Sequence, residues 1–415
     1  MQTAEIVAIG SELLTPQKTD TNSLWLTEKL NELGIEVMLK TVVGDDELRL
    51  EEVIRDALKR SDLVITTGGL GPTEDDVTRQ VSAKAIDRKL VFHQDLEDLL
   101  RERFKRWGRE MPEINKRQAY VIEDATVLPN PNGSAVGMLV TLGQKLLAVL
   151  PGPPREMRPM FEDHVLGRIA EQADNVLVRR RVLKVSGLGE SAVDEAASPI
   201  YRRYENVQTS VLFNKSEVEI HLAAKGTDAD ECDRELAEIA AAIEETLGKA
   251  VFSTTGESME AVVGRMLKDA GQNLSVAESC TGGLIAFRIT GVPGSSAYFV
   301  EGATTYSNRA KIERLGVPEE TIANYGAVST ETAEAMAVGI RNVSGSDHAI
   351  SVTGIAGPDG GTEDKPVGTV CIGYAGPKRV RSVRFVLPGD RYLVRWRSSQ
   401  AAMDILRREL LKQVS

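Results

Sequence analysis

Two potential nucleophiles, Ser279 and Cys280, stand side by side in the run AESCTGG, which spans Ala277 to Gly283. The residues before the pair, 273–277, have the pattern of a strand, and the apolar residues 284–289 after it have that of a helix. A turn between a strand and a helix aims a hydroxyl and free backbone N–H groups at one point. Acyl transfer requires this arrangement, because the N–H groups stabilise the oxyanion that forms when the nucleophile attacks.

A base for the hydroxyl is offered by the run TTYSNRAK, which contains Tyr306 and Lys311. The chain has four histidines, and none is close to either run in the sequence: His93, His164, His221 and His348. We therefore favour a Ser-Lys or Ser-Tyr-Lys arrangement over a Ser-His-Asp triad. A lysine acts as a base only if burial or a neighbouring positive charge lowers its pKa. On an exposed helix face Lys311 would have no such role.

The residue types alone leave the choice between the two nucleophiles open. Cysteine is the stronger nucleophile, but it needs a group that stabilises the thiolate, and buried cysteines are commonly inert. Farther along the chain, a predicted strand ends in the turn Thr353-Gly354-Ile355-Ala356-Gly357. This turn either offers N–H groups and a hydroxyl to a phosphate or an oxyanion, or it is a plain glycine-rich connection.

Another glycine-rich turn lies near the N-terminus, where Gly68, Gly69 and Gly71 follow a predicted buried strand and precede Thr73 and Asp76. Glycines let a phosphate approach the backbone, and the start of the following helix offers unpaired N–H groups. Asp45 follows the adjacent predicted strand, so two carboxylates could converge on one Mg²⁺ or similar hard cation. The alternative is a tight turn whose aspartate only caps a helix.

The elements around these turns alternate between strands and helices over residues 1 to about 171. We predict strands at 5–10, 35–43 and 62–67 and helices at 20–33 and 47–60, followed by a hairpin over 135–150. Such alternation is typical of βαβ units on a mostly parallel sheet. Ligands bind at the carboxyl ends of the strands in sheets of this kind, which is where the glycines and aspartates fall.

The middle of the chain, residues 175–253, has the pattern of a small α+β module with more acidic than basic residues. It contains Gly187-Leu188-Gly189-Glu190, which lacks the Gly-x-x-Gly spacing that a KH domain uses to grip nucleic acid. We expect a spacer or dimerisation element here rather than a reader of nucleic acid. Residues from 256 onward form a further α/β unit.

Composition narrows the class of protein. A chain of 415 residues with a net charge of −11 should fold into two or three domains and lack a general affinity for nucleic acid or anionic membranes. The three cysteines, Cys232, Cys280 and Cys371, show no zinc-ligand spacing and are typical of a reducing compartment. With no signal-peptide pattern and no apolar run of spanning length, we expect a cytoplasmic protein.

The quoted runs, together with TGIAGPDGGTEDKPVGTV, resemble the C-terminal domain of the CinA (competence/damage-inducible protein A) family, a nicotinamide mononucleotide (NMN) deamidase. The N-terminal pattern, including PGPPREM, is similar to the molybdopterin-binding fold that the family shares with molybdenum-cofactor adenylyltransferases. The resemblance implies an α/β protein with a three-layer molybdopterin-binding-like domain (1–172), a KH-like domain (175–253) and an α/β deamidase domain (256–415).

The same resemblance implies roles for single residues. In the deamidase domain it makes Ser279 the nucleophile with Tyr306 and Lys311 as activating partners, with no cofactor. Substrate-binding groups would be Cys280, Thr281, Gly282, Gly283, Thr353, Gly354 and Gly357. In the N-terminal domain, an ADP-ribose pyrophosphatase, it makes Asp45 and Asp76 catalytic residues that hold Mg²⁺, Co²⁺ or Mn²⁺. Gly68, Gly69, Gly71 and Thr73 would bind the substrate, and the family is expected to form homodimers.

One departure from the family pattern concerns the first loop. The family usually has G-N-E-L-L-x-G, whereas this chain has Gly10-Ser11-Glu12-Leu13-Leu14-Thr15-Pro16, with Ser11 in place of asparagine. A serine can still hydrogen-bond there. Two alternatives from other classes remain at this stage: a molybdopterin-type nucleotidyltransferase, and a non-catalytic competence or DNA-repair accessory protein.

Overall fold

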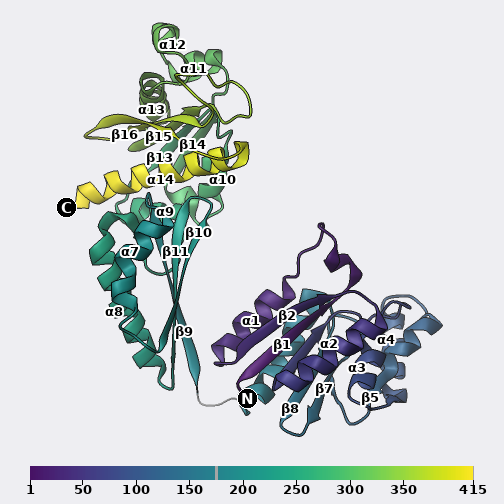
Figure 1. The fold of residues 1–415 in the computed structure, drawn as a ribbon. Coiled ribbons are helices and arrows are strands. Elements are labelled where there is room, and N and C mark those ends of the chain that lie inside the picture. The colour runs from purple at the N-terminus through teal and green to yellow at the C-terminus, as the bar shows by residue number, and fades with distance from the viewer. Residues whose placement is uncertain (173–175, 415) are drawn as a thin grey trace. The chain divides into compact units, whose positions relative to one another are not determined.

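The computed structural model describes residues 1–172 and 176–414, which form two compact units (Figure 1). One unit comprises residues 1–179 and 225–232, and the other comprises 180–224 and residues from 233 onward. The predicted boundary between the first and second domains, at 172–175, falls largely outside the described residues. No described helix is long and apolar enough to cross a membrane.

The N-terminal unit is built on a six-stranded sheet in which four parallel strands are followed by two antiparallel ones. In spatial order the strands are β2 (Glu36–Val43), β1 (Thr3–Ile9), β3 (Leu63–Thr67), β8 (Lys145–Leu150), β7 (Gly137–Leu142) and β6 (Thr126–Leu128). A small separate pair joins β4 (Leu90–Phe92) to β5 (Tyr120–Ile122). The predicted hairpin is β7 and β8, and the mostly parallel sheet is as expected.

Helices cover both faces of this sheet, because successive side chains of a strand point to opposite sides. In β1, Val7 and Ile9 join the core under α2 and α3, whereas Ala4 and Ile6 join the core under α1 and α5. The helices are α1 (Asn22–Glu32), α2 (Glu47–Arg60), α3 (Thr78–Ala85), α4 (Gln94–Arg106), α5 (Pro154–Met160) and α6 (Leu166–Ala170). Three layers result.

The middle module has a four-stranded sheet in the order β10, β11, β9, β12, with two helices. Its elements are β9 (Leu177–Ser186), α7 (Glu190–Tyr201), β10 (Val207–Asn214), β11 (Glu217–Gly226), α8 (Ala229–Leu247) and β12 (Val251–Ser253). Alternate residues of β11 are buried, from Val218 to Ala224. The hairpin between β10 and β11 turns at Lys215, whose φ is +55°.

The C-terminal part has a five-stranded sheet in which the second strand, β13, is parallel to both of its neighbours. The order is β14 (Phe299–Thr304), β13 (Leu274–Glu278), β15 (His348–Gly354), β16 (Thr369–Ala375) and β17 (Val380–Val386). The last two strands run antiparallel. Helices are α9 (Met259–Asp269), α10 (Leu284–Thr290), α11 (Asn308–Leu315), α12 (Glu319–Tyr325), α13 (Thr330–Ser344) and α14 (Arg391–Val414).

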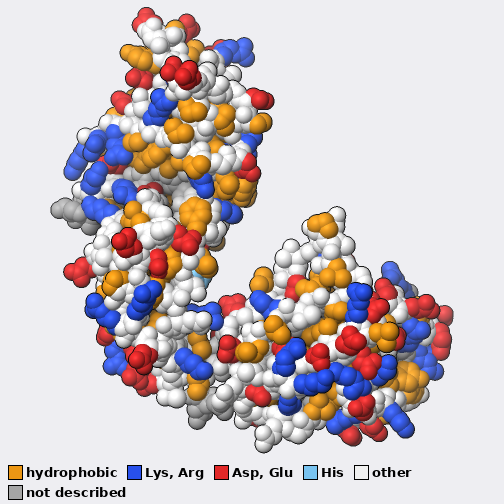
Figure 2. All heavy atoms as spheres, in the orientation of Figure 1, with side chains coloured by type: hydrophobic (Ala, Val, Ile, Leu, Met, Phe, Trp, Pro, Cys, Tyr) orange, Lys and Arg blue, Asp and Glu red, His pale blue; other side chains and the backbone are white. Residues whose placement is uncertain are grey.

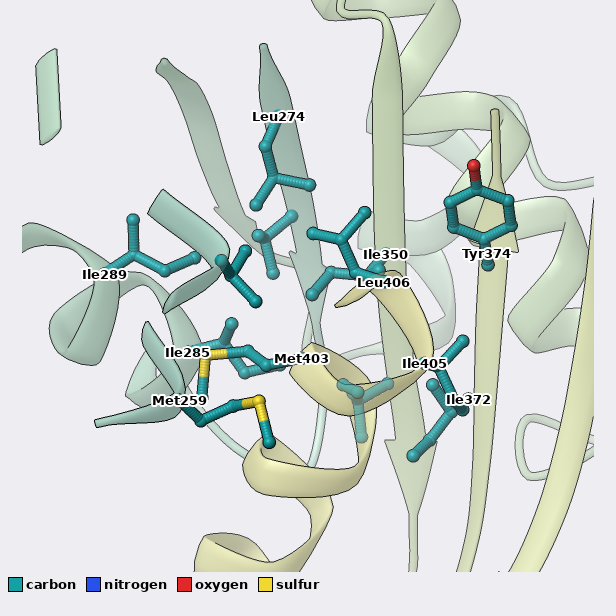
Figure 3. Close-up of a cluster of buried hydrophobic side chains, with 14 of the residues drawn as sticks. Met259, Leu274, Ile285, Ile289, Ile350, Ile372, Tyr374, Met403, Ile405 and Leu406 are labelled. Atoms are coloured by element: carbon teal, nitrogen blue, oxygen red, sulfur yellow. The ribbon is translucent and has the colours of Figure 1, made fainter. Parts of the chain in front are cut away.

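Two cores hold this sheet between its helices. On one face, residues of α9, α10 and α14 pack on β13, β15 and β16, as Figure 3 shows for Leu274, Ile350 and Leu406. On the other face, Met336 and Ile340 of α13 pack on the small side chains Ala277 and Ala349. The loops that follow the parallel strands β13, β14 and β15 therefore emerge at one edge of the sheet, and β13 and β15 are buried.

Candidate active sites

A serine and a lysine meet where β13 and β14 end. The Lys311 Nζ lies 3.1 Å from the Ser279 Oγ, and it also donates to the main-chain oxygens of Thr305 at 3.0 Å and Tyr306 at 3.2 Å. Lys311 is in the first turns of α11, a helix that begins where the Ser307 side chain accepts from the Ala310 N–H. The predicted Ser-Lys pair is therefore assembled.

Burial sets the chemistry of this amine. Lys311 is 1% exposed, and desolvation lowers its pKa. In the part of the chain that the structure describes, no carboxylate is bonded to this amine to favour its charged form. A neutral amine keeps two N–H donors and one lone pair. The two carbonyls can take the two donors, which leaves the lone pair facing the Ser279 hydroxyl. The site thus supplies the condition under which a lysine acts as a base.

The loop after β13 is held as a sharp turn that ends at α10. The buried Glu278 carboxylate accepts from the N–H groups of Ile285 at 3.1 Å and Ala286 at 2.9 Å, and so caps the helix. Gly282 and Gly283 have φ values of +60° and +90°, which favour glycine.

The same loop presents free donors beside the serine. Among the described residues, the N–H groups of Thr281 and Gly283 have no acceptor, and that of Cys280 meets only its own sulfur. These N–H groups follow Ser279 directly in the chain, at the start of a helix whose dipole favours negative charge. They can therefore stabilise an oxyanion formed at the serine.

Cys280 is placed as a core residue. Its side chain is buried, and burial raises the pKa of its thiol to about 12. A Cβ added to Gly354 would lie 3.1 Å from the Cys280 Sγ, so glycine at 354 leaves the sulfur its space. A thiol in this state is not a nucleophile near neutral pH, which favours Ser279.

Tyr306 lies beside the pair, but its phenol makes a different contact from the one predicted. The side chain is 61% exposed, and its hydroxyl accepts from Arg391 Nη2 at 3.2 Å. No hydrogen bond joins this hydroxyl to Ser279 or Lys311 within the described residues. The contribution of Tyr306 to the pair in this structure is its main-chain oxygen, and a relay through the phenol stays a prediction.

Two arginines of α14, outside all of the predicted motifs, reach the same site. Arg391 donates through Nη1 to the Gly357 oxygen at 2.7 Å, and Arg395 donates through Nε and Nη2 to the Thr281 oxygen at 3.2 and 2.7 Å. Each keeps further N–H donors. Their spacing of four residues at the start of a helix places them on one face, which was the signal available in the sequence.

In the described part of the chain, the predicted turn at residues 353–357 makes no hydrogen bond to the Ser279–Lys311 pair through its threonine hydroxyl. The Thr353 hydroxyl donates to the Ala327 oxygen at 2.7 Å, so this hydroxyl already has a structural partner. Gly357 has a φ of +84° and contacts Arg391 through its oxygen. The hydroxyl of Thr281, in contrast, is buried and unpaired among the described residues.

The second site is a cavity of about 720 Å³ in the N-terminal unit, at the carboxyl ends of β1, β2, β3 and β8. Asp45, Asp76, Gly68, Gly69 and Gly71 all line it, as predicted from their place after the strands. Further carboxylates and amides join them: Glu12, Asp20, Asn22, Asp75, Gln118 and Glu156.

Neighbouring residues orient the two aspartates. Asp76 Oδ2 accepts from the Thr73 N–H at 2.9 Å and from the Thr73 hydroxyl at 2.5 Å. Asp45 Oδ2 accepts from the Ser11 N–H at 2.8 Å, and the Asp45 N–H donates to the Ser11 hydroxyl at 3.2 Å. The serine that departs from the family pattern therefore makes a reciprocal pair with the carboxylate.

The glycine-rich loop requires glycine for steric reasons. A Cβ on Gly68 would collide with the Ile9 oxygen, and one on Gly71 would collide with the Asp76 carboxylate. Gly68 has a φ of +114°. Behind the loop, the buried Arg79 donates to the Leu70 oxygen at 3.1 Å, and burial lowers its pKa to about 10. The backbone is thus left open toward the cavity.

Comparisons with known proteins cover nearly the whole chain. Residues 256–410 match the model of the CinA C-terminal domain, residues 5–171 that of a probable molybdopterin binding domain, and residues 180–253 that of the damage-inducible protein CinA KH domain. A CinA-like protein of Solibacter usitatus is 47% identical over 98% of both chains, and one of Koribacter versatilis is 45% identical over 98% of this chain and all of the other. The chain belongs to the CinA family.

Among solved structures, a competence/damage-inducible protein from Agrobacterium tumefaciens is 36% identical, covering 38% of this chain and 98% of its own, with a TM-score of 0.35. The matched models confirm the resemblance drawn from the motifs and the predicted fold class of this CinA protein.

The carboxylates of this CinA protein suit a hard cation. No group of three or more His, Cys, Asp or Glu side chains that could hold a metal is found among the described residues. Mg²⁺ and similar ions, however, are commonly bound by one or two carboxylates, with substrate phosphates and water completing the shell. Asp45 and Asp76 fit as two such oxygen ligands lining one cavity.

The KH module of this CinA protein contacts α14. Lys215, at the tip of the β10–β11 hairpin, lies 4.3 Å from the centre of the Trp396 ring, and its oxygen accepts from Arg397 Nε at 3.1 Å. Gln400 Nε2 donates to Glu217 at 2.9 Å. The hairpin therefore packs on the helix that carries Arg391 and Arg395.

Charge gives no sign of a nucleic-acid surface on the face of the N-terminal unit in Figure 2, where acidic and basic side chains are intermingled. A surface that tracks a phosphate backbone is typically a continuous basic patch.

Proposed function

We propose that the C-terminal domain hydrolyses the carboxamide of NMN to nicotinate mononucleotide and ammonia. The observation that carries this proposal is the buried Lys311 Nζ, 3.1 Å from the Ser279 Oγ. A desolvated amine next to a hydroxyl is suited to amide hydrolysis without histidine. Membership of the CinA family, in which the C-terminal domain is a deamidase by the resemblance above, supplies the substrate.

In this proposal the Ser279 Oγ attacks the carboxamide carbon while Lys311 takes the hydroxyl proton. The oxygen of the tetrahedral intermediate is stabilised by the free N–H groups of the turn that follows the serine. Lys311 then gives its proton to the leaving nitrogen, and ammonia departs from an acyl ester on Ser279. Water attacks that ester with Lys311 again as base, which releases the carboxylate and restores the serine.

The phosphate of the nucleotide would be held by the spare donors of Arg391 and Arg395. Both guanidinium groups lie on the turns that flank Ser279, through the oxygens of Gly357 and Thr281. Arginine forks suit phosphate oxygens geometrically. Placed in this way, they orient the nucleotide with respect to the nucleophile.

For the N-terminal domain we infer cleavage of ADP-ribose to AMP and ribose 5-phosphate. Support comes from the glycine cradle and from two oriented carboxylates in a cavity of about 720 Å³. When bound, a divalent cation would neutralise charge on the pyrophosphate. Asp45 and Asp76 would hold it, while Ser11 and Thr73 fix the direction of those two carboxylates.

A molybdopterin-type nucleotidyltransferase is the second candidate for this domain, because residues 5–171 match a probable molybdopterin binding domain. The two functions differ in product: a transferase joins a nucleotide to an acceptor, whereas the hydrolase only cleaves. A non-catalytic accessory protein would do neither.

The test is to incubate the purified protein with NMN and with ADP-ribose in separate reactions, each with and without a chelator, and to separate the products by chromatography. We expect nicotinate mononucleotide from the first substrate regardless of chelator, and AMP from the second only without it. Ser279→Ala and Asp76→Asn serve as reciprocal controls. Failure of both reactions with folded protein would overturn the proposal and leave the nucleotidyltransferase and the accessory protein.

A further inference from the structure

A second pocket of about 380 Å³ lies in the N-terminal unit beside α4, away from the strand ends. Its volume is within the range of small-molecule sites. The walls are mainly apolar and come from α4, the segment around β6 and α5: Leu96, Leu99, Leu100, Val127, Pro129, Pro131, Val136 and Met160. None of these residues lines the first cavity, which shares only Gln118 and Ser134 with this pocket.

One cation, Arg103, faces this apolar lining. Its side chain is half-buried, and within the described residues no carboxylate or carbonyl accepts from its guanidinium. Burial lowers its pKa, with Arg106 acting in the same direction and Glu156 opposing. A partly desolvated charge without a partner is unfavourable. Binding of an anion next to Arg103 would therefore be favourable.

The other polar groups are less available or less buried. Asn130 donates to the Ala135 oxygen and to Glu156, both at 2.8 Å, and Gln118 donates to the Leu70 oxygen at 3.4 Å. Asp163 is exposed, and His164 lies next to it. Charge recognition inside the pocket thus rests on Arg103.

We propose that this pocket binds a small apolar monocarboxylate. The carboxylate would pair with the Arg103 guanidinium through two N–H donors, and the hydrocarbon or aromatic part would contact the leucines and Met160. Gln118 separates this pocket from the first cavity and bonds to the glycine-rich loop. The occupant would thus sit one side chain away from the loop that lines the candidate phosphate site. The proposal does not depend on which reaction that site performs.

The experiment compares three probes of nearly equal shape on the full-length protein by isothermal titration calorimetry: phenylacetate, phenylacetamide and phenethylamine. Phenylacetate should bind at least tenfold more tightly than the neutral amide, and the amine should bind least. Equal affinity of acid and amide, tightest binding of the amine, which would point to Asp163, or no binding of phenylacetate at millimolar concentration would overturn the proposal.

The variant Arg103→Met should lower phenylacetate affinity to that of the amide, whereas Arg106→Met, on the same helix but outside the pocket lining, should leave it unchanged. A second, independent variant fills the apolar part of the pocket with a larger side chain. Leu100→Trp should abolish binding of both phenylacetate and phenylacetamide. Circular dichroism melts establish that each variant is folded. Unchanged acid binding in Arg103→Met, or equal loss in Arg106→Met, would contradict the assignment.

Discussion

The two candidate sites of this chain share a topology and differ in solvation. Both lie at the carboxyl ends of parallel strands and both use glycine-rich turns. In the C-terminal site the reactive amine is 1% exposed and has its pKa lowered by burial, whereas the N-terminal site is an open cavity lined by several carboxylates.

The difference teaches how one arrangement of strands supports two chemistries. Desolvation lowers the pKa of a lysine, so a larger fraction of the amine is neutral near pH 7 and can accept a proton; the C-terminal site therefore needs a buried amine. Carboxylates must instead stay ionised to hold a cation and polyphosphate, so the N-terminal site needs a polar, open one. The degree of burial of the reactive groups, rather than the arrangement of the strands, therefore distinguishes the two proposed sites.

The largest effect should come from the nucleophile. Ser279→Ala should abolish amide hydrolysis, whereas Cys280→Ala should keep most of it, because the thiol pKa of about 12 makes that sulfur unreactive. Steady-state release of ammonia from NMN measures both. A folded Cys280→Ala protein without activity, next to an active Ser279→Ala protein, would reverse the assignment.

The second-largest effect should come from removing the proposed base, Lys311. Lys311→Met should lower kcat by about 10²–10⁴-fold, the usual contribution of general base catalysis, with little change in substrate binding. Binding of NMN to the inactive variant can be measured by calorimetry. If kcat were kept while KM rose, Lys311 would be a binding residue only.

Chelation and Asp76→Asn should separate the two sites. Both changes should suppress cleavage of ADP-ribose and leave amide hydrolysis within about twofold, because Asp76 lines only the N-terminal cavity. Parallel assays on one preparation give the comparison. Equal loss of both activities would show that the sites are not independent.

The dependence on pH tests the buried amine. Since the neutral form is the base, kcat/KM for NMN should rise with pH through a value below the ordinary lysine pKa of about 10.4.

The lowered pKa of Lys311 also affects stability, because between that pKa and about 10.4 the folded state binds fewer protons than the unfolded state. Stability relative to Lys311→Met should therefore rise with pH between the lowered pKa and about 10.4. Urea denaturation at several pH values measures this difference, and a difference that falls with pH would argue against a desolvated lysine.

The smallest effect concerns the hairpin of the KH module. Lys215→Met removes the charge over the Trp396 ring at an exposed contact, which should cost about 0.5–1 kcal/mol. We expect a modest rise in KM for NMN, since α14 carries Arg391 and Arg395, with kcat unchanged. Lys225→Met, in the same module but without a ring contact, serves as the control. A loss of kcat instead would place the hairpin closer to the chemistry than proposed here.

The bounds of helices and strands with a clear local pattern were predictable from the sequence. The helix predicted at 47–60 matches α2 residue for residue, and the strand before Ser279 differs by one residue at each end. The Ser-Lys pair was also predictable, because both side chains follow the ends of adjacent parallel strands. What the sequence could not supply were contacts from distant segments.

Arg391 and Arg395 come from a helix more than a hundred residues farther along the chain than Ser279. The main-chain oxygens of Gly357 and Thr281 that they contact leave no pattern in the sequence. Tyr306 shows the converse. Its place beside Lys311 in the sequence suggested a shared role, but the turn before α11 directs its phenol toward Arg391. Side-chain direction within a turn depends on tertiary packing, which spacing alone does not encode.

The most direct test of the central claim is to trap the acyl ester. Protein turning over NMN is quenched in acid, digested and analysed by mass spectrometry, with hydroxylamine added to a parallel reaction as a competing nucleophile. The proposed mechanism predicts a nicotinoyl nucleotide ester on the peptide that carries Ser279, a hydroxamate product in the parallel reaction, and neither in Ser279→Ala. An ester on Cys280, or full turnover with neither an ester nor a hydroxamate, would contradict the proposed role of Ser279 and Lys311.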